Sequence, residues 1–309
     1  MAITYHEEHL ADRAAMLAMR GFMAVSAAPP VAPEGRPGYD EMMAKTPAPE
    51  GVEWTAGQIN GVPGWWCHPS DVVPGTAILY LHGGCYVLGS AFAYRGFASQ
   101  IAARAKAATF VADYRLAPEH PFPAAFEDAR RALDGIGAEG FDRIALTGDS
   151  AGGGLGLAVL ASGAAKTLAV AAAVFSPWID LSLSGQTMES RADVDPILSR
   201  TALQQAVDQY FPGGDPSDPR TNAMLGDFAM LPPVRIDVGD DEVLLDDSLR
   251  FHALADAAHQ PPCDVHVWKG MVHVFPANIA MLKVAPEALD GVGAFLRNAL
   301  SERRADGLR

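Results

Sequence analysis

The chain has 309 residues, 49% of them hydrophobic, with a formal net charge of -14 and an isoelectric point near 5.0. This length allows one large core with a smaller appended lobe, and the negative charge argues against a nucleic-acid partner because it repels phosphate groups. No stretch approaches the roughly 18 apolar residues of a membrane span, and charged residues interrupt positions 1–20, where an export signal would need an apolar run. We therefore expect a cytoplasmic protein.

The three cysteines, Cys67, Cys85 and Cys263, lie far apart and form no Cys-x-x-Cys pair. This spacing predicts neither a disulfide framework nor a zinc site, so we expect a reducing compartment and no metal or cofactor. A homodimer is compatible with the sequence.

The first 50 residues are expected to form an arm outside the main sheet. Apolar side chains recur between positions 5 and 25 at the spacing of an amphipathic helix, at Leu10, Leu17, Phe22 and Met23. Prolines and glycines crowd positions 29–49, which makes a continuous helix or strand improbable there.

From residue 51 the pattern alternates between strands and helices. An antiparallel pair, Trp54–Asn60 and Gly64–His68, is predicted around the turn at Asn60-Gly61, followed by a buried strand at Thr76–Leu81. Further strands are predicted near 108–113, 143–148, 168–175, 234–239 and 263–268, and helices near 92–106, 123–136, 151–163, 246–258 and 286–301. This order predicts a mostly parallel, doubly wound sheet, in which reactive groups gather at the carboxyl ends of the strands.

The alternation breaks after Pro177, where a polar stretch, a helix near 200–211 and a turn-rich segment follow. We interpret residues 181–220 as a lobe inserted over the site. Residues 51–180 and 221–309 then form the core, and residues 1–50 form the N-terminal cap arm.

A Gly-x-Ser-x-Gly motif at Gly148–Gly152 lies between a predicted strand and a predicted glycine-rich helix. A sharp strand-to-helix turn exposes a serine hydroxyl, and the next backbone N–H, here that of Ala151, can stabilise an oxyanion. The motif alone is weak, since a plain glycine-rich turn would also contain it, but its position makes Ser150 a candidate nucleophile.

A serine nucleophile needs a base and a third group that orients the base. Of the nine histidines, His273 is best placed, because it follows the last predicted strand and lies after the acidic candidates. The acid is expected among Asp240, Asp241 and Glu242, and spacing alone does not choose between them. The rival interpretation of this acidic cluster, a calcium loop, lacks the alternating acids and the glycine that such a loop needs.

The segment His82-Gly83-Gly84-Cys85-Tyr86 follows the strand Thr76–Leu81, and two of its N–H groups, with that of Ala151, could bind an oxyanion. A plain glycine turn is the alternative. The Gly-x-Gly-x-x-Gly pattern at 135–140 is not a dinucleotide site, because it follows a helix and leads into a strand, the reverse of the required order.

Together these motifs resemble those of the bacterial hormone-sensitive lipase-like (family IV) esterases, and the match covers nearly the whole chain. Besides the glycine segments, similar stretches are Asp113–Ala125, Ser176–Leu181, Asp195-Pro196 and Leu231–Pro233. The resemblance implies an α/β-hydrolase fold with a mostly parallel, doubly wound, eight-stranded sheet and a helical cap made by the N-terminal arm and the inserted lobe.

The resemblance also bears on the site. Setting the family's second acid on Asp246 places the catalytic acid at Glu242, which we prefer to Asp241, with Asp240 third. The oxyanion donors would be the N–H groups of Gly84, Cys85 and Ala151, provided that Cys85, which replaces a family glycine, does not need a positive φ. We expect the Cys85 thiol to be buried and inert.

We therefore predict a serine carboxylic-ester hydrolase that acts on short to medium acyl esters through Ser150, His273 and Glu242. The partner would be a small-molecule ester substrate. The alternatives are a non-catalytic ligand-binding protein on the same fold, and a lactone hydrolase, carbamate hydrolase or deacetylase.

Overall fold

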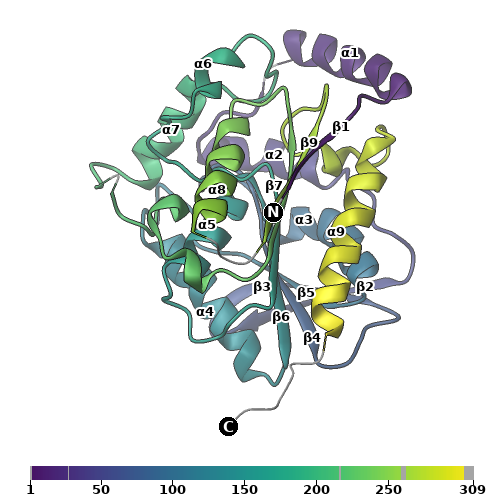
Figure 1. Cartoon of the computed structure of the whole chain (residues 1–309), viewed down its shortest axis with the longest axis vertical. Coiled ribbons are helices and arrows are strands. Elements are labelled where there is room, and N and C mark those ends of the chain that lie inside the picture. Colours follow the sequence, from purple (N-terminus) through teal and green to yellow (C-terminus); the bar gives the residue numbers. More distant parts are fainter. Residues whose placement is uncertain (1, 27, 216, 259–261, 303–309) are drawn as a thin grey trace.

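The computed structural model describes residues 2–26, 28–215, 217–258 and 262–302. These residues contain one nine-stranded sheet in the order β1-β9-β8-β7-β6-β4-β5-β3-β2 (Figure 1). All neighbouring pairs are parallel except β5 with β3 and β3 with β2, so the expected mostly parallel sheet is confirmed.

The predicted strands are present with small shifts at their ends. They are β2 (Val52–Ile59), β3 (Val62–Pro69), β4 (Thr76–Leu81), β5 (Ala108–Ala112), β6 (Arg143–Asp149), β7 (Ala171–Phe175), β8 (Val234–Gly239) and β9 (Cys263–Trp268). The turn between β2 and β3 consists of Asn60 and Gly61, with φ of 48° and 78°. Positive φ at both turn residues matches the twist of the two strands, which is why Asn-Gly predicted this hairpin.

Helices cover both faces of the sheet (Figure 1). On one face lie α3 (Ala91–Ala105) and α9 (Val284–Ser301), which pack against each other, and on the other lie α4 (Ala124–Ala138), α5 (Ser150–Ala161) and α8 (Leu245–Ala257). The central strands β4 to β7 are buried on both faces, except for Arg143 at the start of β6, and they are rich in Ala, Val, Ile and Leu. This composition is typical of parallel strands between two helical layers.

The ninth strand is β1 (Ile3–His6), which sequence analysis had placed in an arm outside an eight-stranded sheet. It pairs in parallel with β9, from Ile3 opposite Val265 to His6 opposite Trp268. The imidazole of His6 stacks on the indole of Trp268, with ring centroids 3.7 Å apart. Pairing with β1 satisfies the backbone groups on this side of β9 and moves the edge of the sheet to a strand of four residues, and short edge strands are less prone to pair with other chains.

The predicted N-terminal helix therefore starts later than expected. Helix α1 spans Leu10–Val25, and His9 caps it by accepting a hydrogen bond from the backbone N–H of Ala11. Met16 is buried in a small cluster with Trp268 and Phe275, which fixes α1 against the end of the sheet.

The helices expected to form a cap, α1, α6 (Thr187–Ser190) and α7 (Arg200–Tyr210), lie near the carboxyl ends of the parallel strands, at the upper end of the molecule (Figure 1). The arm also contains α2 (Arg36–Met43). Short 3-10 turns complete the chain at η1 (Pro33–Gly35), η2 (Ala223–Leu225), η3 (Phe228–Met230) and η4 (Phe275–Asn278). None of the described helices has both the length and the apolar composition needed to cross a membrane.

The strand order reverses at β4, because β5 lies on one side of it and β6 on the other. In doubly wound sheets, ligands bind in the crevice beyond the carboxyl ends of the strands at such a switch point. The segment beginning at His82 follows β4, and Ser150 follows β6, so both candidate segments lie at this point.

Candidate active site

Ser150 occupies the tight corner at which β6 ends and α5 begins. Its φ is 51°, in the left-handed region that residues with a Cβ rarely adopt. The flanking glycines are required by close approach to the end of β4: a Cβ on Gly148 would lie 2.5 Å from the carbonyl oxygen of Leu81, and one on Gly152 would lie 2.1 Å from it. The Gly-x-Ser-x-Gly motif is thus explained by the packing of the corner against β4.

The segment after β4 curls through three consecutive residues with positive φ. Gly84 has a φ of 111°, Cys85 of 57° and Tyr86 of 63°. The condition that Cys85 should not need a positive φ is therefore not met, and its Cβ costs about 1–2 kcal/mol of strain. The N–H groups of Gly84, Cys85 and Ala151 donate no hydrogen bond to any other described residue.

Asp149 ties this segment to the serine-bearing strand. Its Oδ1 accepts hydrogen bonds from the backbone N–H of Gly83 at 3.0 Å and from the hydroxyl of Tyr80 at 2.6 Å, and its Oδ2 accepts one from Tyr94 at 3.1 Å. Burial raises the pKa of this carboxyl group to about 6, although the hydrogen bonds of Tyr80 and Tyr94 oppose the rise. The residue just before Ser150 therefore holds the start of the candidate oxyanion segment.

The three consecutive acids after β8 have different partners. Asp240 accepts a hydrogen bond from the backbone N–H of Gly270 at 2.6 Å. Asp241 forms a salt bridge with Arg20 of helix α1, with 2.5 Å between Nη2 and Oδ2. Only Glu242, among the described hydrogen bonds of the three acids, contacts His273, with 2.9 Å between Oε2 and Nδ1.

His273 lies in the loop between β9 and η4 and is buried, as is Glu242. Burial lowers the pKa of His273, but the hydrogen bond and negative charge of Glu242, together with the charges of Asp195 and Asp149, outweigh it, so the net pKa is raised above 6.5. His273 follows β9 and Ser150 follows β6, so both lie beyond the carboxyl ends of parallel strands, although no hydrogen bond joins them among the described residues.

Several of the other histidines have structural partners. His6 pairs with His266 at 2.9 Å, His82 contacts the carbonyl oxygen of Gly83 at 2.8 Å, and Nδ1 of His252 lies 2.7 Å from the carbonyl oxygen of Cys263. His259 lies outside the described residues. Across the described ranges, no group of three or more His, Cys, Asp or Glu side chains is arranged to hold a metal ion.

Two further residues, which lie in stretches similar to those of the family and were not predicted as site residues, contact this site. The hydroxyl of Ser176, directly after β7, donates a hydrogen bond to Oε1 of Glu242 at 2.7 Å. Asp195, between α6 and α7, accepts a hydrogen bond from the backbone N–H of Val243 at 2.9 Å and so holds the turn that carries Glu242. The position of Ser176, directly after a strand, was a signal available in the sequence, whereas Asp195 follows no strand and had no such signal.

Asp246 and Asp247 lie in the first turn of α8, where their negative charge meets the positive end of the helix dipole. Both also hold the segment after β7: Asp247 accepts hydrogen bonds from the N–H groups of Ile179 and Asp180, and Asp246 accepts one from Gln186. Burial raises the pKa of Asp247 to about 7.

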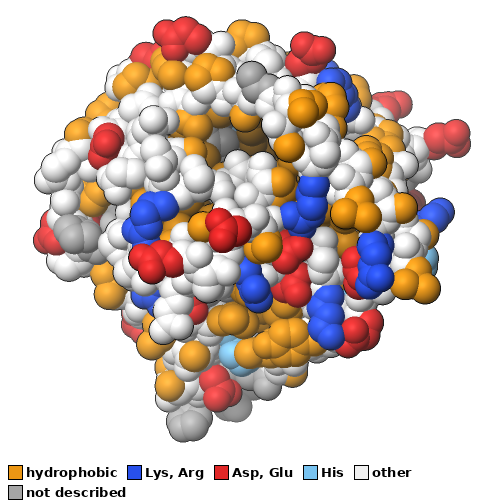
Figure 2. Space-filling view, turned by 90° about the horizontal axis from the view of Figure 1, so that it is seen from above, with side chains coloured by type: hydrophobic (Ala, Val, Ile, Leu, Met, Phe, Trp, Pro, Cys, Tyr) orange, Lys and Arg blue, Asp and Glu red, His pale blue; other side chains and the backbone are white. Residues whose placement is uncertain are grey.

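The face of the molecule over the carboxyl ends of the strands is hollowed near its centre, and hydrophobic side chains line the hollow (Figure 2). At the end of the candidate oxyanion segment, the ring of Tyr86 stacks on that of Tyr210 from α7, with centroids 3.9 Å apart and planes 3° apart. This stack joins α7 to the segment that follows β4.

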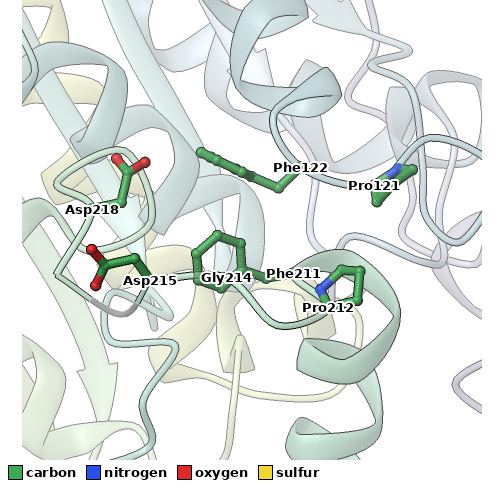
Figure 3. Close-up of a pocket in the computed structure, with 7 residues that line it drawn as sticks. All are labelled: Pro121, Phe122, Phe211, Pro212, Gly214, Asp215 and Asp218. Carbon is green, nitrogen blue, oxygen red and sulfur yellow. The ribbon is translucent and has the colours of Figure 1, made fainter.

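A separate cavity of about 310 Å³ lies at the seam between the loop before α4 and the segment after α7 (Figure 3). Its lining is Pro121, Phe122, Phe211, Pro212, Gly214, Asp215 and Asp218. None of the candidate catalytic or oxyanion residues lines it, so this cavity is distinct from the serine corner.

Comparisons with known proteins agree with this architecture. Residues 78–277 match the family described as having the alpha/beta hydrolase fold. An acetyl-hydrolase of Streptomyces hygroscopicus is 38% identical over 77% of this chain and 80% of its own length, and an esterase of Acinetobacter venetianus is 33% identical over 71% and 73%. A crystal structure of an esterase from the bacterial hormone-sensitive lipase family superimposes with a TM-score of 0.87 at 34% identity, covering 94% of this chain and 98% of the other.

The chain is thus a member of the α/β-hydrolase fold family and, within it, of the bacterial hormone-sensitive lipase-like esterases. The fold class and the family resemblance inferred from the sequence motifs are confirmed. The expectation of an enzyme of the carboxylesterase and lipase class is confirmed as well.

Proposed function

We propose that this protein hydrolyses carboxylic esters of short to medium acyl chains through a triad of Ser150, His273 and Glu242 and a covalent acyl-enzyme. The observation that carries the proposal is the hydrogen bond between the buried Glu242 and His273, at the same end of the sheet as the strained serine corner. The name of the Streptomyces relative, an acetyl-hydrolase, supports the short end of the acyl range.

In the proposed mechanism, Nε2 of His273 takes the proton of the Ser150 hydroxyl as Oγ attacks the ester carbonyl carbon. Glu242 holds the proton on Nδ1, so that Nε2 is free to accept, and its charge stabilises the imidazolium that forms. The imidazolium then protonates the leaving alcohol. Water then attacks the acyl carbon while His273 takes one of its protons, and the resulting imidazolium protonates Oγ of Ser150 as the acid is released.

The tetrahedral intermediate carries a negative oxygen that needs hydrogen-bond donors. We assign this role to the N–H groups of Gly84, Cys85 and Ala151, which have no acceptor among the described residues. Loss of one such donor typically costs about 3 kcal/mol of barrier stabilisation. The positive φ at Cys85, which the sequence-based assignment of donors excluded, costs strain but does not remove the N–H donor, and strained backbone of this kind clusters at active sites.

The proposed cap consists of the arm of residues 1–50 and the lobe of residues 181–220. Both reach the acidic turn: Arg20 of α1 binds Asp241, and Asp195 of the lobe binds the N–H of Val243. Substrate binding at the hollowed face would therefore be coupled to the turn that carries Glu242.

The test is turnover of an aryl ester by the Ser150→Ala variant, with fluorophosphonate labelling of the wild-type protein. We expect labelling at Ser150 and a loss of activity of about 10⁴-fold or more in the variant. Retention of more than a few percent of turnover would refute the triad, and absence of labelling on the folded protein would favour a ligand-binding protein.

A further inference from the structure

The segment 176–178, directly after β7, makes hydrogen bonds near all three members of the proposed triad. The hydroxyl of Ser176 donates to Glu242 and accepts from the backbone N–H of Val274, the residue after His273, at 3.0 Å. The N–H of Trp178 donates to the carbonyl oxygen of Ser150 at 2.9 Å. One short segment therefore links the three stretches of chain that follow strands β6, β8 and β9.

The hydrogen bonds of the Glu242 carboxylate divide between its two oxygens. Oε1 accepts from Ser176 at 2.7 Å and from the backbone N–H of Gly239 at 2.6 Å, whereas Oε2 faces Nδ1 of His273 at 2.9 Å. Two donors on Oε1 prevent the carboxylate from rotating without breaking a buried hydrogen bond, which is costly. This division leaves Oε2 as the oxygen that faces the imidazole.

The backbone at both ends of the Ser176 hydrogen bond is strained. Ser176 has a φ of 45° and Val274 a φ of 51°, and a β-branched residue such as valine is rarely found in this region. Strain of this kind persists where surrounding interactions over-determine the conformation, often at functional sites. Ser176 is also fully buried, so its hydroxyl cannot exchange these partners for bulk water.

We propose that Ser176 is a positioning residue of the reaction, whose hydroxyl fixes the oxygen of Glu242 that faces His273 and holds the backbone beside the imidazole. The proposal deepens the proposed function and depends on it for its catalytic meaning. We assign no proton transfer to Ser176, because its hydroxyl contacts Oε1 of Glu242 and the backbone N–H of Val274 rather than the imidazole of His273.

The first experiment compares Ser176→Ala with Ser248→Ala. Ser248 is an equally buried serine on α8, and its hydroxyl has no partner among the described residues, so it controls for the loss of a buried hydroxyl. We expect Ser176→Ala to lower kcat about 10- to 100-fold with little change in KM, by analogy with groups that orient metal ligands. Ser248→Ala should remain near wild type.

The pH profile separates positioning from general destabilisation. Burial lowers the pKa of His273, and Glu242, Asp195 and Asp149 together raise it above its ordinary value. If the hydroxyl of Ser176 holds Oε2 of Glu242 against the imidazole, removing that hydroxyl weakens the interaction by which Glu242 raises the pKa of His273. The acid limb of the kcat/KM profile then moves to lower pH. An acid limb that stays in place or moves to higher pH in folded Ser176→Ala would overturn the proposal, as would wild-type kcat.

Ser176→Gly provides a variant that tolerates the backbone conformation, because glycine adopts positive φ without strain. It should share the kinetic defect of Ser176→Ala, and full activity in the glycine variant would show that the hydroxyl is dispensable. The low-field NMR signal of the proton between His273 and Glu242 gives a readout that needs no turnover. If wild-type protein hydrolyses no ester but this signal shifts in Ser176→Ala, the proposed function fails while the positioning role stands; an unchanged signal refutes the positioning role.

Discussion

Replacing Glu242 by glutamine tests the proposed triad with the smallest change of shape. In the wild-type protein Oε1 accepts from Ser176 and Gly239 and Oε2 accepts from the N–H at Nδ1 of His273. In Glu242→Gln the amide oxygen can keep the two donors on its side, which places the amide NH2 group against Nδ1. Because Nδ1 must then accept, the ring proton moves to Nε2, and Nε2 can no longer take the proton of Ser150.

The expected magnitude follows from this change of tautomer. The equivalent aspartate-to-asparagine change in a serine protease lowers kcat by about 10⁴-fold, which corresponds to roughly 5 kcal/mol of transition-state stabilisation. The matched control is Asp241→Asn, which removes a salt bridge with Arg20 in which each side chain is 26% exposed. Such a pair is worth at most about 1 kcal/mol, so the control should retain activity within roughly fivefold.

The assay is kcat and kcat/KM on one aryl ester across pH, with circular dichroism to confirm folding. His273 must be neutral to act as a base, and its raised pKa shifts the acid limb of the wild-type profile to higher pH than an unperturbed imidazole would give. In Glu242→Gln the raising hydrogen bond and charge are lost while burial still lowers the pKa, so residual activity should extend to lower pH. A Glu242→Gln enzyme within tenfold of wild type, or a larger loss in Asp241→Asn, would refute the assignment of the acid.

Three further predictions follow from strained or buried groups. Cys85→Gly should stabilise the fold by up to about 1–2 kcal/mol in denaturant titrations, because glycine removes the Cβ strain at a φ of 57°. The variant should also keep ester turnover, because burial raises the pKa of the Cys85 thiol to about 12 and leaves it unreactive. A large loss of activity would show an unexpected role for the thiol. Asp149→Ala should lower kcat about 10- to 100-fold, because it releases the N–H of Gly83 at the start of the candidate oxyanion segment. The magnitude is taken by analogy with groups that orient metal ligands. A wild-type kcat would contradict this anchoring role of Asp149. Burial raises the pKa of Asp247 to about 7, so the stability that its protonated form contributes is complete below pH 4 and is lost as pH rises through 7. The unfolding free energy of Asp247→Asn should lack this decline. An identical pH dependence in the wild-type protein and the variant would contradict the raised pKa.

The sequence by itself determined the fold class and the positions of the main chemical groups. Strand and helix periodicity, the Asn60-Gly61 turn and the glycines around Ser150 are local features, and local features act through short-range sterics and hydrogen bonding. The same reasoning located His273, because in a parallel sheet any residue just after a strand lies at the end where ligands bind.

Only the tertiary structure decided which of the three consecutive acids faces the imidazole, because Asp240, Asp241 and Glu242 share one turn and differ only in the partners that other segments bring to them. Gly270, Arg20 and His273 come from distant parts of the chain, so their contacts cannot be read from spacing. The same holds for β1, whose four residues carry too weak a pattern to predict their pairing with β9. It holds also for the hydroxyl of Ser176, whose partners meet only when three strands lie side by side.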